Sequence, residues 1–267
     1  MLHAMHDLGV DVVSIGLPAS GPRAQDTAVR LAREIASARL RLRPTAAART
    51  TERDVIAVAR VAEKAGIPIE VYSFIGTSPI RRFVEGWDLE FVIAHIREAC
   101  AAAASAGLPL CLVTEDTTRT PPDALTTIYA AAVDAGATRL CLCDTVGHVD
   151  PHGTRALVEF VRATLDAAGA HHVGIDWHGH DDRGLALGNA LTAVLAGVDR
   201  VHGTALGLGE RCGNPRMDHL LRALEQIGLR AAVGDDAYER YVDLAAKAFG
   251  ARDGTSGSSR RGRVVNE

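Results

Sequence analysis

The chain has 267 residues, of which 47% are hydrophobic and 23% are charged, and its formal net charge is -4. This length and apolar content suffice for one sizeable core, so a single α/β domain is expected. The small net charge and the lack of basic clusters interleaved with aromatic residues argue against a nucleic-acid partner. No apolar run is long enough to cross a bilayer. The five cysteines form no CxxC pair and no leader peptide is visible, so we expect a soluble, cytoplasmic protein.

Short β-branched runs alternate with longer Ala- and Leu-rich segments from residue 11 onward, a pattern typical of βα units around a parallel sheet. Seven strands are predicted, at Asp11–Leu17, Arg43–Ala48, Ile67–Ile75, Pro109–Glu115, Arg139–Asp144, Val173–His178 and Arg200–Leu206. Helices are predicted after them, at Arg23–Ala38, Arg53–Ala65, Leu89–Ala106, Pro122–Ala135, Pro151–Ala168, Gly184–Ala196 and Pro215–Ile227.

The first nine residues look like the last turns of a helix that stops at Gly9. A helix that opens a chain and leads into a barrel strand normally follows a strand. We therefore expect a TIM (β/α)8-type barrel that lacks strand 1, in a chain truncated at its N-terminus. The predicted organisation is an incomplete barrel domain over residues 1–230, an extra C-terminal helix within 231–249, at Asp235–Phe249, and a disordered Gly/Ser/Arg-rich tail over 250–267.

Two histidines close the sixth predicted strand, at the end where a barrel enzyme keeps its active site. His178 and His180 stand at i and i+2, so both imidazoles project from one face and can reach one divalent cation. For an isolated pair, hydrogen bonding to neighbouring loops is an equally good explanation, and the position at a strand end favours metal ligation. Asn214, just before Pro215, suits a metal ligand and a helix N-cap equally well.

Further polar candidates follow other strands. A buried carboxylate of Glu115 beside a cation can act as a general base, whereas two solvated acids, Glu115 and Asp116, neutralised by Arg119 are the alternative. Thr145 can contact a substrate or simply form a turn with Gly147. For Thr204, the alternative to a substrate contact is a hydroxyl that only bonds to the backbone, and for Glu210 with Arg211 it is a surface ion pair of little consequence.

Five motifs occur together in a characteristic order. They are Phe74-Ile75-Gly76-Thr77-Ser78-Pro79, Thr114-Glu115-Asp116 with Arg119, Asp144-Thr145-Val146-Gly147, His178-Gly179-His180-Asp181-Asp182, and Gly207-Leu208-Gly209-Glu210-Arg211-Cys212-Gly213-Asn214. Through these motifs the chain, from Met1 to about Gly228, resembles the barrel domain of the 2-isopropylmalate synthase and homocitrate synthase family. That family also includes 3-hydroxy-3-methylglutaryl-CoA lyase and the carboxyltransferase barrel of pyruvate carboxylase. Any one motif alone is a weak signal, and the five together are highly specific.

The resemblance implies an acyltransferase of amino-acid biosynthesis that condenses acetyl-CoA with a 2-oxo acid in a metal-dependent Claisen reaction. It implies Mg, Mn or Zn as the cation, and a homodimer. The metal residues it assigns are His178, His180 and Asn214, and the catalytic residues are Glu115 and Thr145. The substrate-binding residues it assigns are Ser73, Thr77, Arg119, Asp144, Thr204, Glu210 and Arg211.

Two departures from the family keep alternatives open. The Asp-Arg-Asp-Gly-type motif, which supplies a metal carboxylate and an arginine from strand 1 in the family, does not occur in this sequence. A non-catalytic barrel remnant therefore stays an alternative. Cys212 lies in Glu-Arg-Cys-Gly-Asn and not in the Gly-Gly-Cys-Pro context of the lyase branch, so we expect a small packed residue there and favour the synthase over a lyase that cleaves a 3-hydroxyacyl-CoA. A metal-dependent amidohydrolase fits poorly, because its HxH pair normally lies on the first barrel strand.

Overall fold

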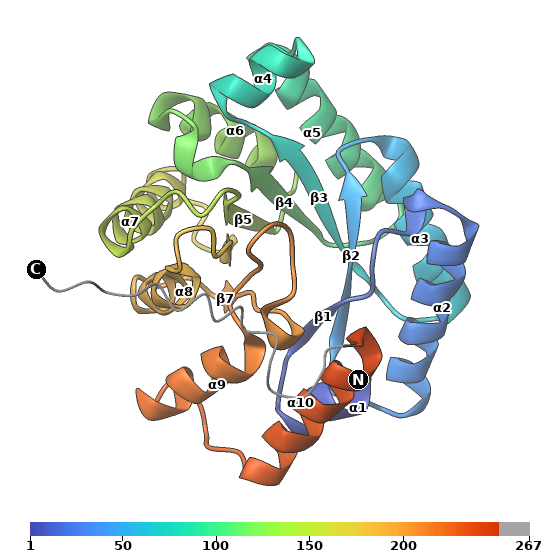
Figure 1. Ribbon diagram of the computed structural model, residues 1–267. Coiled ribbons are helices and arrows are strands. Elements are labelled where there is room, and N and C mark those ends of the chain that lie inside the picture. The colour runs from blue at the N-terminus through green and yellow to red at the C-terminus, as the bar shows by residue number, and fades with distance from the viewer. Residues whose placement is uncertain (251–267) are drawn as a thin grey trace, which may run out of the picture.

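Seven parallel strands form a single sheet in the computed structural model, which describes residues 1–250. Each strand pairs with its neighbour in sequence, in the order β1 to β7, and the sheet curls around a central axis (Figure 1). The strands are β1 (Val12–Ser14), β2 (Arg43–Arg49), β3 (Glu70–Gly76), β4 (Leu110–Glu115), β5 (Arg139–Asp144), β6 (Gly174–Gly179) and β7 (Arg200–Val201). The predicted tail from residue 251 onward lies outside the described residues.

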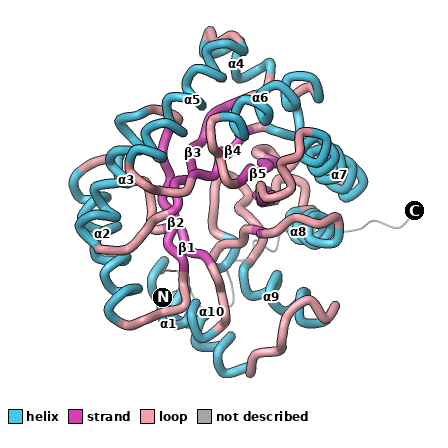
Figure 2. Tube along the Cα trace, turned by 180° about the vertical axis from the view of Figure 1, so that it is seen from behind, coloured by secondary structure: helices cyan, strands magenta, loops and turns pink. Residues whose placement is uncertain are grey.

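Helices follow the strands and surround the outer face of the sheet (Figures 1 and 2). The α-helices are α1 (Leu2–Asp7), α2 (Pro22–Ser37), α3 (Glu52–Ala65), α4 (Pro79–Glu85), α5 (Leu89–Ser105), α6 (Pro122–Asp134), α7 (Pro151–Ala167), α8 (Ala186–Leu195), α9 (Met217–Gln226) and α10 (Asp235–Phe249). Short 3-10 turns lie at η1 (Pro18–Ser20), η2 (Thr117–Arg119) and η3 (Ala205–Gly207). Helix α10 packs against α1 and η3, beside the N-terminus of the chain.

The sheet has two edges, β1 and β7, which do not pair with each other. An eight-stranded barrel has no such edges, because its last strand closes on its first. The described chain therefore has the TIM-barrel type of architecture with seven strands, and the predicted fold class is confirmed. None of its described helices combines the length and the apolar character needed to span a membrane.

Alternation along the strands explains how the sheet separates two environments. Val71, Leu112 and Ile175 point outward and are buried against the helices. Their neighbours Tyr72 and Cys111 point to the inner side, where the cysteines of β4 and β5 form a small separate cluster. Burying one large aliphatic side chain contributes about 1.5–3 kcal/mol, so the outer layer carries most of the stabilisation and leaves the interior free for polar groups.

The last strand is much shorter than the predicted Arg200–Leu206. Strand β7 ends at Val201, and the chain then turns against the start of α9. A Cβ atom on Gly203 would lie 3.1 Å from the Pro215 carbonyl oxygen, tighter than most such contacts, so glycine favours this close approach. Leu206 adopts a left-handed conformation with φ 56, which is incompatible with a continued strand.

Helix α4 was not predicted and sits in the segment assigned to a loop. The residues at its start favour a helix N-terminus. The Ser78 hydroxyl caps the helix by accepting a hydrogen bond from the Arg81 amide at 3.2 Å, and Pro79 occupies the first turn. Gly86, in the left-handed region, ends the helix after two turns.

Candidate metal and substrate site

The two predicted histidines face each other at the carboxyl end of β6. Their Nε2 atoms lie 3.2 Å apart. Two nitrogens that share a Zn²⁺ ion, each about 2.0–2.1 Å from it, are roughly 2.8–3.4 Å apart, at the short end for octahedral angles and at the long end for tetrahedral ones. Burial lowers the pKa of both histidines, and with the neighbouring His202 and His180 it lowers that of His178 to about 3. Both imidazoles are therefore neutral near pH 7, which is the form that binds metal ions.

Asn214 reaches the same strand end. Its Nδ2 donates to the Gly179 carbonyl oxygen at 2.7 Å, which fixes the amide and leaves Oδ1 for another partner. The Nδ1 atom of His180 is buried and has no hydrogen-bond partner within residues 1–250. In the same part of the chain, no group of three or more His, Cys, Asp or Glu side chains is placed to hold a metal ion. The residues therefore fit part of a metal site, made of two imidazoles and an amide oxygen, without a carboxylate.

Glu115 ends β4 and is half-buried. Burial raises the pKa of this carboxyl above its usual value, although Arg81 opposes the shift. A raised pKa moves a carboxylate closer to the proton affinity that a general base needs near neutral pH. Next to it, Asp116 accepts hydrogen bonds from Nε and Nη2 of Arg119 at 2.7 and 2.8 Å, as expected for a supporting ion pair.

Asp144 and Thr145 connect the loops after β4 and β5. The Thr145 hydroxyl accepts a hydrogen bond from the Asp116 amide at 2.7 Å, so its own hydrogen is available to a ligand. Asp144 is fully buried, and its Oδ1 accepts from the His148 amide at 2.8 Å. Its Oδ2 has no partner among the described residues, and burial raises the pKa of the carboxyl.

The loop after β7 is held over the site by one arginine. Arg211 donates to both carboxylate oxygens of Asp182, at 2.6 and 2.9 Å, and also to the Thr145 carbonyl oxygen at 2.6 Å. It does so in a left-handed backbone conformation with φ 52, which costs an arginine roughly 1 kcal/mol or more. Glu210 lies on the exposed side of the same loop and pairs with Arg211 at 3.3 Å. The Thr204 hydroxyl below this loop is buried without a partner in the described chain.

Two of the predicted substrate residues are engaged elsewhere. Ser73 lies on the face of β3 opposite Tyr72 and donates to the Thr50 hydroxyl at 3.1 Å. Thr77 is fully buried and donates to the Glu115 carbonyl oxygen at 3.1 Å. Both hydroxyls thus form hydrogen bonds to neighbouring segments of the protein, Ser73 to the residue after β2 and Thr77 to the end of β4. Cys212, expected to be packed, is instead exposed on the Arg211 loop, because its neighbour Arg211 turns back toward Asp182.

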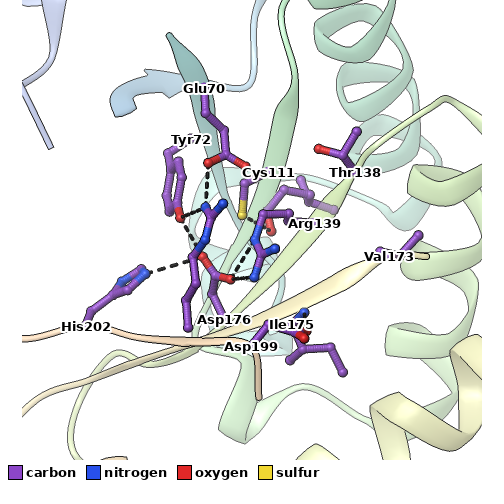
Figure 3. A network of polar contacts seen from close by, with 12 residues as sticks. Glu70, Tyr72, Cys111, Thr138, Arg139, Val173, Ile175, Asp176, Asp199 and His202 are labelled. Carbon is purple, nitrogen blue, oxygen red and sulfur yellow. Dashed lines mark hydrogen bonds and ion pairs between the residues drawn. The ribbon is translucent and has the colours of Figure 1, made fainter. Parts of the chain in front are cut away.

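A buried polar network beneath the histidines was not anticipated from the sequence (Figure 3). The Tyr72 hydroxyl donates to Asp176 at 2.5 Å, and Arg139 binds the other oxygen of that carboxylate through Nε at 2.8 Å. His202 connects the network to the site, with its Nε2 3.5 Å from Asp176 and its Nδ1 3.3 Å from Nδ1 of His178. Burial alone would raise the pKa of Asp176, but His202 and Arg139 outweigh it and lower that pKa to about 2.

The spacing of Asp176 was a usable signal. It precedes His178 by two residues on the same strand, so the three polar side chains at 176, 178 and 180 share one face. His202 carried no local motif, because its proximity to His178 depends on the pairing of β6 with β7.

The family model described as HMGL-like matches residues 1–242. The 2-isopropylmalate synthase of Stenotrophomonas maltophilia (strain R551-3) is 34% identical over 227 residues, which cover 84% of this chain and 42% of that protein. The 2-isopropylmalate synthase of Sediminispirochaeta smaragdinae is 31% identical over 226 residues, covering 84% of this chain and 44% of that protein.

The chain thus spans less than half the length of these curated relatives. Among solved structures, the hydroxymethylglutaryl-CoA lyase of Pseudomonas aeruginosa superposes with a TM-score of 0.72 at 17% identity, over 96% of this chain and 87% of the lyase chain. This structural similarity shows the fold. Membership of the family is shown by the family model and by the relatives that are more than 30% identical in sequence. The chain belongs to the HMGL-like family.

Proposed function

We propose that this protein serves a metal-dependent Claisen condensation of acetyl-CoA with a 2-oxo acid, as the name of its 2-isopropylmalate synthase relatives indicates for them. The observation that carries the proposal is the pair of neutral imidazoles, His178 and His180, with Nε2 atoms 3.2 Å apart at the carboxyl end of a barrel strand. We extend the proposal to a cytoplasmic homodimer with no nucleic-acid or membrane partner.

His178, His180 and the amide oxygen of Asn214 would hold the cation, and Mg, Mn or Zn all suit such donors. When bound, the cation would supply a Lewis acid for the keto and carboxylate oxygens of a 2-oxo acid. Since the described residues offer no carboxylate for this ion, the remaining ligands have to come from substrate, water or protein outside them.

Glu115 is the proposed base that takes a proton from the methyl group of acetyl-CoA. Its raised pKa, caused by burial, supports this role. The free hydrogen of the Thr145 hydroxyl can be donated to a substrate oxygen, because its oxygen is already occupied by the Asp116 amide. Asp144 and Thr204 each present a buried oxygen without a partner in residues 1–250, and we propose that both contact the substrate.

Arg211, Glu210 and Arg119 act on the shape of the site. Arg211 holds the last loop against Asp182 and the Thr145 carbonyl, so it fixes the orientation of Thr145. Arg119 keeps Asp116 in place and thereby positions the amide that binds Thr145. These contacts support a positioning role for the three side chains.

A lyase reaction is the second candidate, and the exposure of Cys212 favours it. In that reaction the same site would cleave a 3-hydroxyacyl-CoA, and a thiol on the rim loop would be available for proton transfer. Replacing Cys212 with serine separates the two: a condensing enzyme keeps its activity, whereas a lyase that uses the thiol loses most of it.

A thiol-release assay tests the proposal. Purified protein is incubated with acetyl-CoA, one 2-oxo acid from a panel and Mg²⁺, Mn²⁺ or Zn²⁺, and free CoA is measured over time. We expect release that depends on both the oxo acid and the cation, and that His180→Gln abolishes. His172→Gln, at an exposed position outside the strand, is the matched control and should keep full activity. Because the relatives are longer, the assay is run on this chain and on any longer form with an upstream strand.

A further inference from the structure

A cavity lies at the opposite end of the sheet from His178. It has a volume of about 630 Å³ and is lined by residues at the amino-terminal starts of several strands, among them Arg43, Glu70 and Arg139. Arg200, at the start of β7, and Arg39, after α2, complete its charged lining. The proposed function uses none of these side chains at the metal site, and the volume falls in the range of small-molecule sites.

The cavity has an excess of positive charge. Four arginines line it. Arg139 pairs with the buried Asp176 and Arg200 pairs with Glu70, so the excess comes from Arg39 and Arg43. Arg200 gives only its Nη1 to Glu70 and Tyr72, at 2.5 and 3.2 Å, and within residues 1–250 its Nε and Nη2 make no hydrogen bond. Arg39 and Arg43 form no ion pair in the described chain. Several guanidinium donors are therefore available to an anion in the cavity.

Arg39 also has an unusual backbone conformation. It follows the end of α2 with φ 50, in the left-handed region that favours glycine. At the equivalent position the other barrel helices have glycine in that region: Gly66 after α3, Gly107 after α5, Gly136 after α6, Gly169 after α7 and Gly197 after α8. An arginine replaces the favoured residue at the one helix end that lines the cavity, so the strain coincides with a charge placed there.

We propose that this cavity binds a small carboxylate with a branched aliphatic body. The arginines would take the carboxylate, and Ile35, Leu42 and Ile67, which line the same cavity, would cover the aliphatic part. The mixture of apolar wall and guanidinium groups favours such a ligand over inorganic phosphate, which has no apolar surface to bury.

Isothermal titration of the whole chain with isovalerate, inorganic phosphate and 3-methylbutan-1-ol tests this assignment. We expect isovalerate to bind at least about tenfold more tightly than either of the other two, because the alcohol lacks the charge and phosphate lacks the apolar body. Tighter binding of phosphate, or equal binding of the alcohol, would overturn the proposed ligand class.

Two variants and a control locate the site. Arg39→Gly should weaken isovalerate binding about tenfold while its melting temperature stays equal to that of the wild type or rises, because the backbone strain is relieved. Arg43→Gln should weaken binding to a similar extent. Arg41→Gln removes a charge from the same exposed segment without touching the cavity, and should bind as the wild type does. Unchanged affinity in Arg39→Gly and Arg43→Gln, or an equal loss in Arg41→Gln, would overturn the site.

Discussion

His202 lies between Asp176 and His178, with its Nδ1 3.3 Å from Nδ1 of His178 and its Nε2 3.5 Å from the Asp176 carboxylate. The Nδ1 atom of His178 is thereby engaged on the inner side, so its Nε2 faces His180. Partners on the second ring nitrogen fix the orientation of metal-binding histidines in proteins generally. The buried network of His202 and Asp176 thus supports the orientation of His178 in the proposed metal site.

Replacing His202 with phenylalanine should weaken divalent metal binding about tenfold to a hundredfold, because His178 loses its partner while the ring volume is kept. Titration of the apo protein with Zn²⁺ against a competing chelator measures the effect. His95→Phe, which changes a histidine on helix α5 far from the network in sequence, is the control and should bind metal normally. Normal affinity in His202→Phe would show that the contact with His178 has no positioning role.

Replacing His180 with glutamine should abolish tight Zn²⁺ binding, since one of only two imidazole ligands is lost. Stability should change little, because Nδ1 of His180 makes no hydrogen bond within the described residues. Chelator titration and thermal unfolding of the same sample report the two quantities. Tight binding that persists would place the metal elsewhere.

Asp144→Asn should stabilise the protein by about 1 kcal/mol at pH 7, since it removes a buried charge while the carbonyl oxygen still accepts from the His148 amide. The folded-state pKa of Asp144 is raised by burial, so the wild type gains stability as the pH falls through that pKa and the carboxyl becomes protonated. The advantage of the variant should therefore shrink at pH 4. Urea unfolding at both pH values measures it, and an advantage that grows toward pH 4 would contradict this account.

Arg211→Lys should lower kcat/KM at least about tenfold, because a lysine keeps the charge but cannot bind Asp182 and the Thr145 carbonyl together. Unfolding stability should change by less than about 1 kcal/mol, because this ion pair is partly exposed to solvent. Glu210→Gln, which loses only one contact with Arg211, should lower kcat/KM by less than Arg211→Lys does. Full activity in Arg211→Lys would mean that the positive charge alone is sufficient, and an equal loss in Glu210→Gln would contradict the particular role of the Arg211 contacts.

The periodicity of the sequence was enough to predict the seven strands and one long helix after each of them. It worked because outward-facing residues such as Val71 and Ile175 are regularly buried against helices. The predicted end of β7 was wrong. The strand stops where Gly203 approaches Pro215, and this tertiary contact leaves no local pattern in the sequence. Helix α4 was missed because its two turns have no buried residue to give a periodic signal.

The candidate site was predictable where residues are close in sequence. His178 and His180 share a strand face by simple alternation, and the structure brings them together. The placement of Ser73 depended on which face of β3 turns inward, and motif resemblance alone did not decide this. His202 required knowledge of strand pairing, so it could be found only in three dimensions.

The most direct test of the proposed condensation is mass spectrometry of the product acid formed from acetyl-CoA labelled with ¹³C in both acetyl carbons and unlabelled 3-methyl-2-oxobutanoate. The account predicts a hydroxy diacid that carries both labelled carbons, formed only with the divalent cation and in step with CoA release. It should appear with this chain or with a longer form that supplies an eighth strand between β1 and β7, and His180→Gln should remove it. Labelled acetate without any condensed product, from folded and metal-loaded protein in both forms and across the panel of oxo acids, would contradict the account.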